Sequence, residues 1–113
     1  ACVRRPAHRG AETAMMIVIF DADREWYIQG RVYADIVRSV PAGMLQDDDL
    51  ESHLWPARAM GLLRLPVMEP DRAERIAAAL AEGAARRLRT IDQSDTELVT
   101  FYEGLRETAA GRA

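Results

Sequence analysis

At 113 residues the chain fits one domain, and an apolar content of 49% is enough for one hydrophobic core. The net charge of −3 argues against general nucleic-acid binding, which needs a basic surface. Cys2 is the single cysteine, so an internal disulfide bond is excluded. All fifteen positive side chains are arginines and nineteen residues are alanines, which indicates a GC-rich, bacterial coding sequence.

The first residues of the chain lack any hydrophobic periodicity. We interpret residues 1–14 as an N-terminal arm, poorly ordered or upstream of a natural start at Met15 or Met16, and residues 15–113 as a single α+β domain. No apolar stretch approaches the roughly 20 residues that a membrane helix needs. We therefore expect a cytoplasmic protein that binds no membrane.

A β-hairpin is predicted after the arm. Residues 15–20 (MMIVIF) are apolar at every position and rich in β-branched side chains, which is typical of a strand buried on both faces. Residues 21–24 favour a turn, and residues 25–29 alternate, with Trp26 and Ile28 on one side and Tyr27 and Gln29 on the other. A lone hairpin is marginal in water, so it needs helices on one face or a second copy from a partner chain.

Helical spacing replaces the strand pattern from Arg31 onwards. A first apolar stripe ends before Pro41, and a second helix begins at the three aspartates 47–49, with Pro56 kinking or dividing it. Residues 62–68 (LLRLPVM) are too apolar for an exposed loop, and we expect them to form a buried connector across the core.

The last two helices have the clearest pattern. Capping boxes at Asp71 with Glu74 and at Ser94 with Glu97 predict their first turns, and apolar residues then recur at helical spacing. The predicted fold is therefore α+β, with an N-terminal β-hairpin followed by about four helices, the last two an antiparallel pair.

The strand that runs into Asp21 and Asp23 resembles the opening of haloacid-dehalogenase-type phosphatases over residues 15–23. In that family the first Asp is a nucleophile and the second an acid/base group. The family also requires a Lys, a Ser or Thr after a second strand, and a late pair of acids that hold magnesium. This chain has no Lys and no later strand ending in an acid pair. We therefore predict that the two aspartates bend the hairpin.

A dense group of carboxylates at 47–51 stands beside His53 and suggests a cation site. The alternate-position spacing of a calcium loop is absent, and Asp49 with His53 would supply only two ligands from one helix face. We interpret the acids as a solvated helix N-terminus. No complete motif for catalysis, nucleotide binding or metal binding is found, so no catalytic residue, metal or cofactor is predicted.

Candidate contact residues for a partner follow from residue type and position. The aromatic residues Trp26, Tyr27 and Trp55 are of the kind enriched in binding hot spots, although Trp26 also suits the core. Ala77 and Ala81 belong to a stripe of small residues that lets another helix approach closely, either in a dimer or within the chain. Acidic and basic blocks also alternate along the sequence, which favours self-association.

These features lead to a ranked set of hypotheses. The first is a small non-enzymatic interaction or regulatory protein, antitoxin-like or immunity-like, which binds another protein or itself as a homodimer. The first alternative is a small metal-dependent or acid/base hydrolase that uses Asp21 and Asp23 together with the acids at 47–51. The second alternative is a small-ligand sensor, which needs an apolar pocket between the hairpin and the helices.

Overall fold

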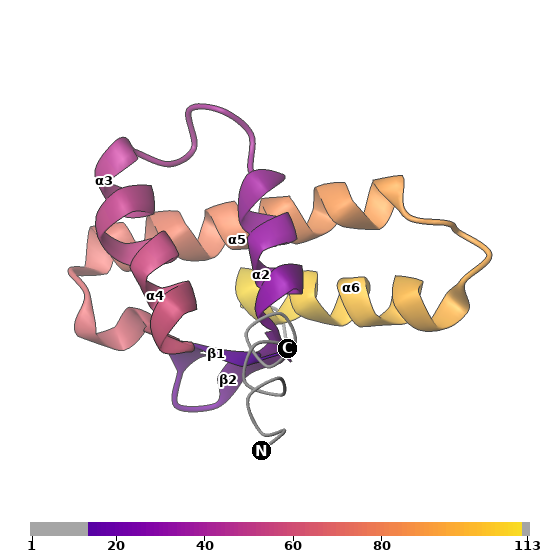
Figure 1. The fold of residues 1–113 in the computed structure, drawn as a ribbon, viewed down its shortest axis with the longest axis horizontal. Coiled ribbons are helices and arrows are strands. Elements are labelled where there is room, and N and C mark those ends of the chain that lie inside the picture. Colours follow the sequence, from indigo (N-terminus) through magenta and orange to yellow (C-terminus); the bar gives the residue numbers. More distant parts are fainter. Residues whose placement is uncertain (1–13, 112–113) are drawn as a thin grey trace, which may run out of the picture.

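The computed structural model describes residues 14–111, and these form the predicted α+β fold of an N-terminal sheet followed by helices (Figure 1). The predicted arm, apart from Ala14, lies outside the described residues. None of the helices within residues 14–111 is long and apolar enough to span a membrane. The elements in chain order are β1 (Met15–Asp21), β2 (Arg24–Gln29), α2 (Gly30–Arg38), α3 (Asp47–Asp49), the π-helical turn η1 (Leu50–Leu54), α4 (Trp55–Met60), β3 (Leu62–Arg64), the 3-10 turn η2 (Leu65–Val67), α5 (Pro70–Thr90) and α6 (Thr96–Ala110).

The sheet has three strands in the order β2-β1-β3. β1 and β2 form the predicted antiparallel hairpin, whereas β3 runs parallel to β1. The sequence predicted a buried connector over residues 62–68, and this is wrong in part: only Leu63 and Leu65 are buried, and the segment contains the strand β3. Gly61 ends α4 with a φ of 77°, a left-handed conformation that favours glycine, and it directs the chain into the strand. The free edge of β1 then finds hydrogen-bond partners in residues 62–64.

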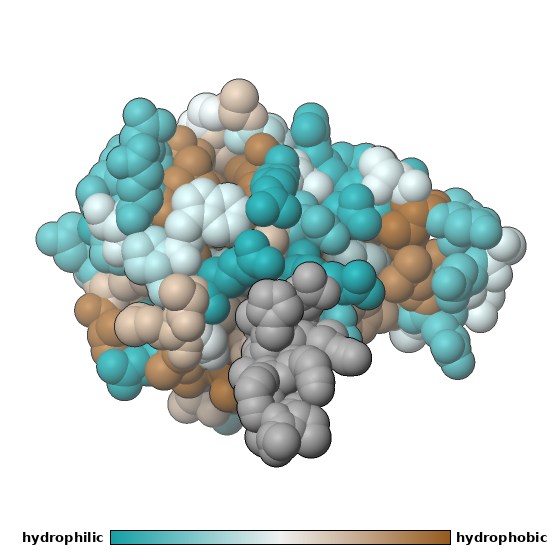
Figure 2. All heavy atoms as spheres, viewed as in Figure 1, coloured by the Kyte–Doolittle hydropathy of each residue, from teal (hydrophilic) through white to brown (hydrophobic). Residues whose placement is uncertain are grey.

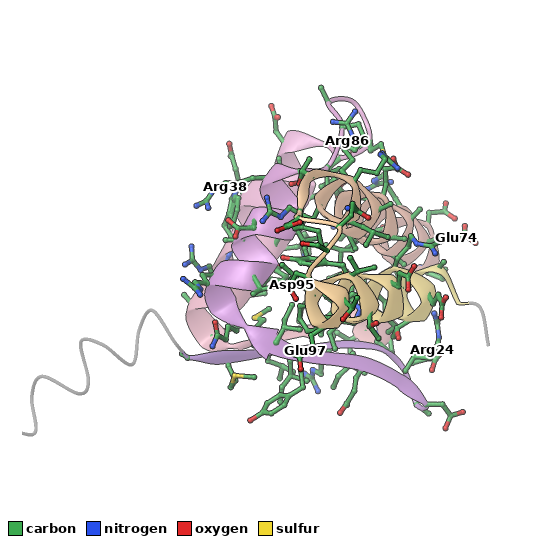
Figure 3. All side chains as sticks on the ribbon, turned by 90° about the vertical axis from the view of Figure 1, so that its right-hand side faces the viewer. Arg24, Arg38, Glu74, Arg86, Asp95 and Glu97 are labelled. Carbon is green, nitrogen blue, oxygen red and sulfur yellow. The ribbon has the colours of Figure 1, made fainter. Side chains whose placement is uncertain are left out.

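All the helices lie on one side of this sheet, as Figure 3 shows with the sheet along its lower edge. Burial alternates along β1, because one set of side chains faces the helices and the other set faces away. The prediction that this strand is buried on both faces is therefore wrong for the described part of the chain. Across the three strands, the side chains that face the helices and are buried are Met16, Val18, Phe20, Trp26, Ile28 and Leu63.

Two buried hydrogen bonds join elements that are distant in the sequence. The indole N–H of Trp26 donates to the carbonyl oxygen of Leu105 at 3.0 Å and joins the hairpin to α6. The hydroxyl of Tyr33 in α2 donates to the carbonyl oxygen of Leu54 at 2.8 Å. Burial raises the pKa of Tyr33, so this hydroxyl keeps its proton and remains a donor.

The helical segment over residues 47–60 is continuous through α3, η1 and α4. Pro56 is predicted to kink or divide this segment, and the helix type does change directly before it, from the π-helical turn η1 to α4, although the helical run is not interrupted. The wider turn η1 immediately precedes Pro56, and such a turn accommodates a residue that has no N–H to donate to the preceding turn.

The last two helices, α5 and α6, pack against each other as an antiparallel pair, as predicted (Figure 1). Their predicted capping boxes are wrong. α5 begins at Pro70, a residue that suits the first helical position because its missing N–H would have no partner there, and the residue before it, Glu69, makes no side-chain capping bond. α6 is capped by the carboxylate of Asp95, which accepts the N–H of Leu98 at 3.1 Å, while Ser94 bonds instead to Asp92.

Candidate protein-binding surface

The side of the sheet that faces away from the helices forms a surface that we call the open face. No element within residues 14–111 covers it, and in Figure 3 its side chains project below the sheet. The open face consists of Met15, Ile17, Ile19, Glu25, Tyr27, Gln29, Leu62 and Arg64.

Strand register arranges the open face in cross-strand rows. The middle row is wholly apolar, because Ile17 lies between Tyr27 on β2 and Leu62 on β3. In the next row Ile19 lies between Glu25 and Arg64, so one acid and one base stand on opposite sides of the central strand. The surface is therefore an apolar centre with one charge of each sign at its lateral borders.

Exposed apolar side chains extend this surface past the edge strand β3. Tyr27 on the open face is 64% exposed, and Met60 and Val67, which flank β3 in the sequence, are 75% and 69% exposed. Met60 and Val67 border a hollow of about 480 Å³ that Leu62 and Arg64 also line. Figure 2 shows apolar residues gathered at the lower left, where α4, η2 and the sheet meet in Figure 1. Contiguous apolar surface of this kind marks interaction sites on proteins.

The structure separates the predicted contact residues. Tyr27 lies on the open face, whereas Trp26 is 1% exposed and belongs to the core, out of reach of any partner. Trp55 is half-buried, with the guanidinium of Arg38 5.5 Å from its ring centroid. Sequence reasoning missed Ile17, Ile19 and Leu62, although the apolar run at 15–20 was the signal that could have identified the first two.

Ala77 and Ala81 lie elsewhere, in a groove along α5. This groove has a volume of about 860 Å³, and the end of β1, η2 and the last turns of α6 form its other walls. Alanine is the commonest residue in its lining, and Glu74, Glu82 and Arg106 stand among the other residues that line it. Between residues 14 and 111, neither the open face nor the groove is filled by another segment of the chain.

Asp47, Asp48 and Glu51 are exposed near the start of the 47–60 helix, as predicted for a solvated helix N-terminus, but Asp49 is completely buried. Its carboxylate accepts two hydrogen bonds from Arg75, both at 2.8 Å, and a third from Arg72 at 3.1 Å. Arg72 also donates to Asp48 at 2.9 Å and to Nε2 of His53 at 2.8 Å. Arginine has no acceptor, so the Nε2 lone pair must accept this bond. The carboxylates of Asp48 and Asp49 and the imidazole of His53 therefore bind the guanidinium groups of Arg72 and Arg75. These two cations occupy the place that a metal ion would take in a cation site.

The charge on Asp49 is strongly stabilised. Hydrogen bonds from Arg75 lower the pKa of this carboxyl to about 2, against an opposing effect of burial, and the backbone N–H of Gln46 adds to the lowering. The cluster joins the start of the 47–60 helix to the first two turns of α5. Its role is structural, because every oxygen of the buried carboxylate is already occupied by a protein donor.

Asp21 and Asp23 bend the hairpin, as predicted. The carboxylate of Asp21 accepts the N–H of Asp23 at 2.9 Å and Nε of Arg24 at 2.7 Å, and the hydrogen bond from Arg24 lowers the pKa of Asp21. Arg24 also donates to the carbonyl oxygen of Thr108 at 2.6 Å, at the end of α6. Among the described residues that line the groove bordered by Asp21, none belongs to the 47–51 group. Residues 14–111 also contain no group of three or more His, Cys, Asp or Glu that could hold a metal ion.

Comparison of the whole chain with family models, curated proteins and solved structures gives no match.

Proposed function

We propose that this protein is a small, cytoplasmic, non-enzymatic interaction module, antitoxin-like or immunity-like, that regulates by binding another protein or itself through the open face of its sheet. The single observation that carries the proposal is an apolar row, Tyr27–Ile17–Leu62, on a sheet face that no described element covers.

Two physical arguments support this proposal. Ile17 and Ile19 are half-buried within residues 14–111, and covering the part of each side chain that stays exposed would add stability, since full burial of such a side chain stabilises by roughly 1.5–3 kcal/mol. Strands that are apolar at every position normally belong to sheets covered on both faces. The helices cover one face, and a partner on the other would complete the burial that the sequence of β1 implies.

The chemistry of the acids supports a binding role over the hydrolase alternative. That alternative needs Asp21 and the acids at 47–51 in one pocket. In the structure Asp21 is bound by Arg24 at the hairpin turn, whereas Asp49 is bound by Arg75 near the start of α5. Both carboxylates are engaged in positioning the backbone, so we do not propose a hydrolase.

Site-specific photo-crosslinking tests the proposal directly. We expect p-benzoylphenylalanine at position 27, on the open face, to give a discrete crosslinked product in the cells that make the protein. The same group at position 103, on the exposed side of α6, serves as the control. Denaturing gels followed by mass spectrometry identify the product, which contains either a second copy of this chain or another protein. Equal labelling patterns from both positions would contradict the proposal.

A small-ligand sensor is a second candidate, and the groove along α5 favours it. The groove lies between the hairpin and the helices, and its size is typical of ligand sites. Its alanines suit an elongated apolar molecule, and Arg106, which takes part in no ion pair within residues 14–111, would bind a carboxylate at one end of it, away from Glu74 and Glu82. We expect dodecanoate to raise the midpoint of thermal unfolding, because a ligand of the native state stabilises it by mass action. Ala81→Phe should abolish the rise by filling the floor, and an unchanged wild-type midpoint would exclude this candidate.

A further inference from the structure

We propose that the partner of the open face is a second copy of this chain, so that two sheets pack face to face in a symmetric dimer. This inference rests on the proposed function, because it names the partner for the same surface. It follows from the order of the strands and from the positions of two charged side chains.

The strand order makes the open face able to pair with itself. β1 is the central strand, with β2 on one side and β3 on the other. A two-fold axis that runs along β1, between two such faces, places β1 over the partner's β1 and β2 over the partner's β3. Ile17 then meets its own copy, and Tyr27 lies opposite Leu62 of the partner subunit.

The charges on the open face fit the same axis. Glu25 and Arg64 occupy one cross-strand row, each beside Ile19 but on opposite strands. The rotation therefore brings Glu25 opposite Arg64 of the partner subunit, and Arg64 opposite Glu25 of the partner subunit. Among the ion pairs within residues 14–111, neither side chain takes part. A surface that carries only one sign of charge would repel its copy, whereas this one is complementary to itself.

The resulting arrangement is an ordinary one for proteins. Two sheets with their strands nearly aligned pack about 10 Å apart over interdigitated apolar side chains. Long side chains such as Glu and Arg span that distance at the border of an interface. The helices, which lie on the far side of each sheet, do not obstruct the approach (Figure 3).

Substitutions that reverse the charge at position 25 or 64 test this dimer, with sedimentation equilibrium on the full chain as the measurement. We expect the wild type to be dimeric, and Glu25→Arg or Arg64→Glu alone to weaken the dimer at least tenfold, because each creates two like-charge contacts. The double variant Glu25→Arg/Arg64→Glu should restore the dimer. An equimolar mixture of the two single variants should form a heterodimer, since both contacts are then attractive.

Glu103→Arg on α6 is the matched control and should leave the dimer unchanged. Circular dichroism and thermal unfolding show whether each variant is folded. A wild-type monomer at all accessible concentrations would overturn the dimer, as would single variants that dimerise like the wild type. A crosslink from position 27 to a different protein, together with a monomeric wild type, would overturn the dimer while supporting the proposed interaction function.

Discussion

Replacing Asp49 with Ala should lower the free energy of unfolding by about 3–5 kcal/mol, which is a large part of the stability of a small domain. The buried carboxylate accepts both Arg75 hydrogen bonds and one from Arg72. Its removal leaves two arginines, only 24% and 28% exposed, without their buried partner. Urea denaturation followed by circular dichroism measures the loss.

Asp48→Ala is the matched control for this change. Asp48 is 57% exposed and makes one ion pair with Arg72, so its loss should cost less than about 1 kcal/mol. If the two variants lost equal stability, Asp49 would not be the centre of the cluster.

The carboxylate of Asp49 should also make the free energy of unfolding depend on pH in the acid range. Its pKa falls from an ordinary value of 3.8 to about 2 on folding, so the unfolded chain takes up the proton first as the pH falls. The stabilisation is therefore complete above about pH 5 and is lost as the pH falls toward 2, amounting to roughly 2 kcal/mol. We expect the stability difference between wild type and Asp49→Asn to shrink over that range. A difference independent of pH would contradict this assignment.

Local patterns in the sequence predicted the fold class but not the contacts that carry stability and surface chemistry. The turn at Asp21 and the stripe at Ile76 and Leu80 follow from neighbours within a few residues. Asp49 and Arg75 are 26 positions apart, so no local pattern indicates their pairing. β3 was missed for the same reason: three residues are too short for a period, and the free edge of β1 determines their conformation.

The open face illustrates a different limit of sequence reasoning. The apolar run at residues 15–20 predicts burial on both faces of the strand, whereas within the described part of the chain only alternate side chains are fully buried. Within residues 14–111 the helices cover only one face of the sheet, and Ile17 and Ile19 lie half-buried on the other face. The sheet face that the prediction wrongly expected to be covered within the chain is therefore the surface on which the proposed function depends.

Gly83→Ala should destabilise the protein by about 1–3 kcal/mol, even though alanine is the better helix former. A Cβ atom at Gly83 would overlap the carbonyl oxygen of Ile36 and lie 3.1 Å from Cγ2 of Val40. The small residues of α5 were predicted to admit another helix closely, and at Gly83 that helix is α2. The substitution forces α2 away from α5, and thermal unfolding measures the cost.

Gly104→Ala in α6 provides the opposite case within the same chain. A Cβ atom there meets no other atom within 4 Å, so only the helix propensity changes. We expect a gain of about 0.5–1 kcal/mol, because alanine loses less backbone freedom on folding. Opposite signs for the two variants would show that close packing of α2, and not the backbone conformation, requires glycine at position 83. If both substitutions stabilised the protein, the contact between α2 and α5 would have to be looser than the structure shows.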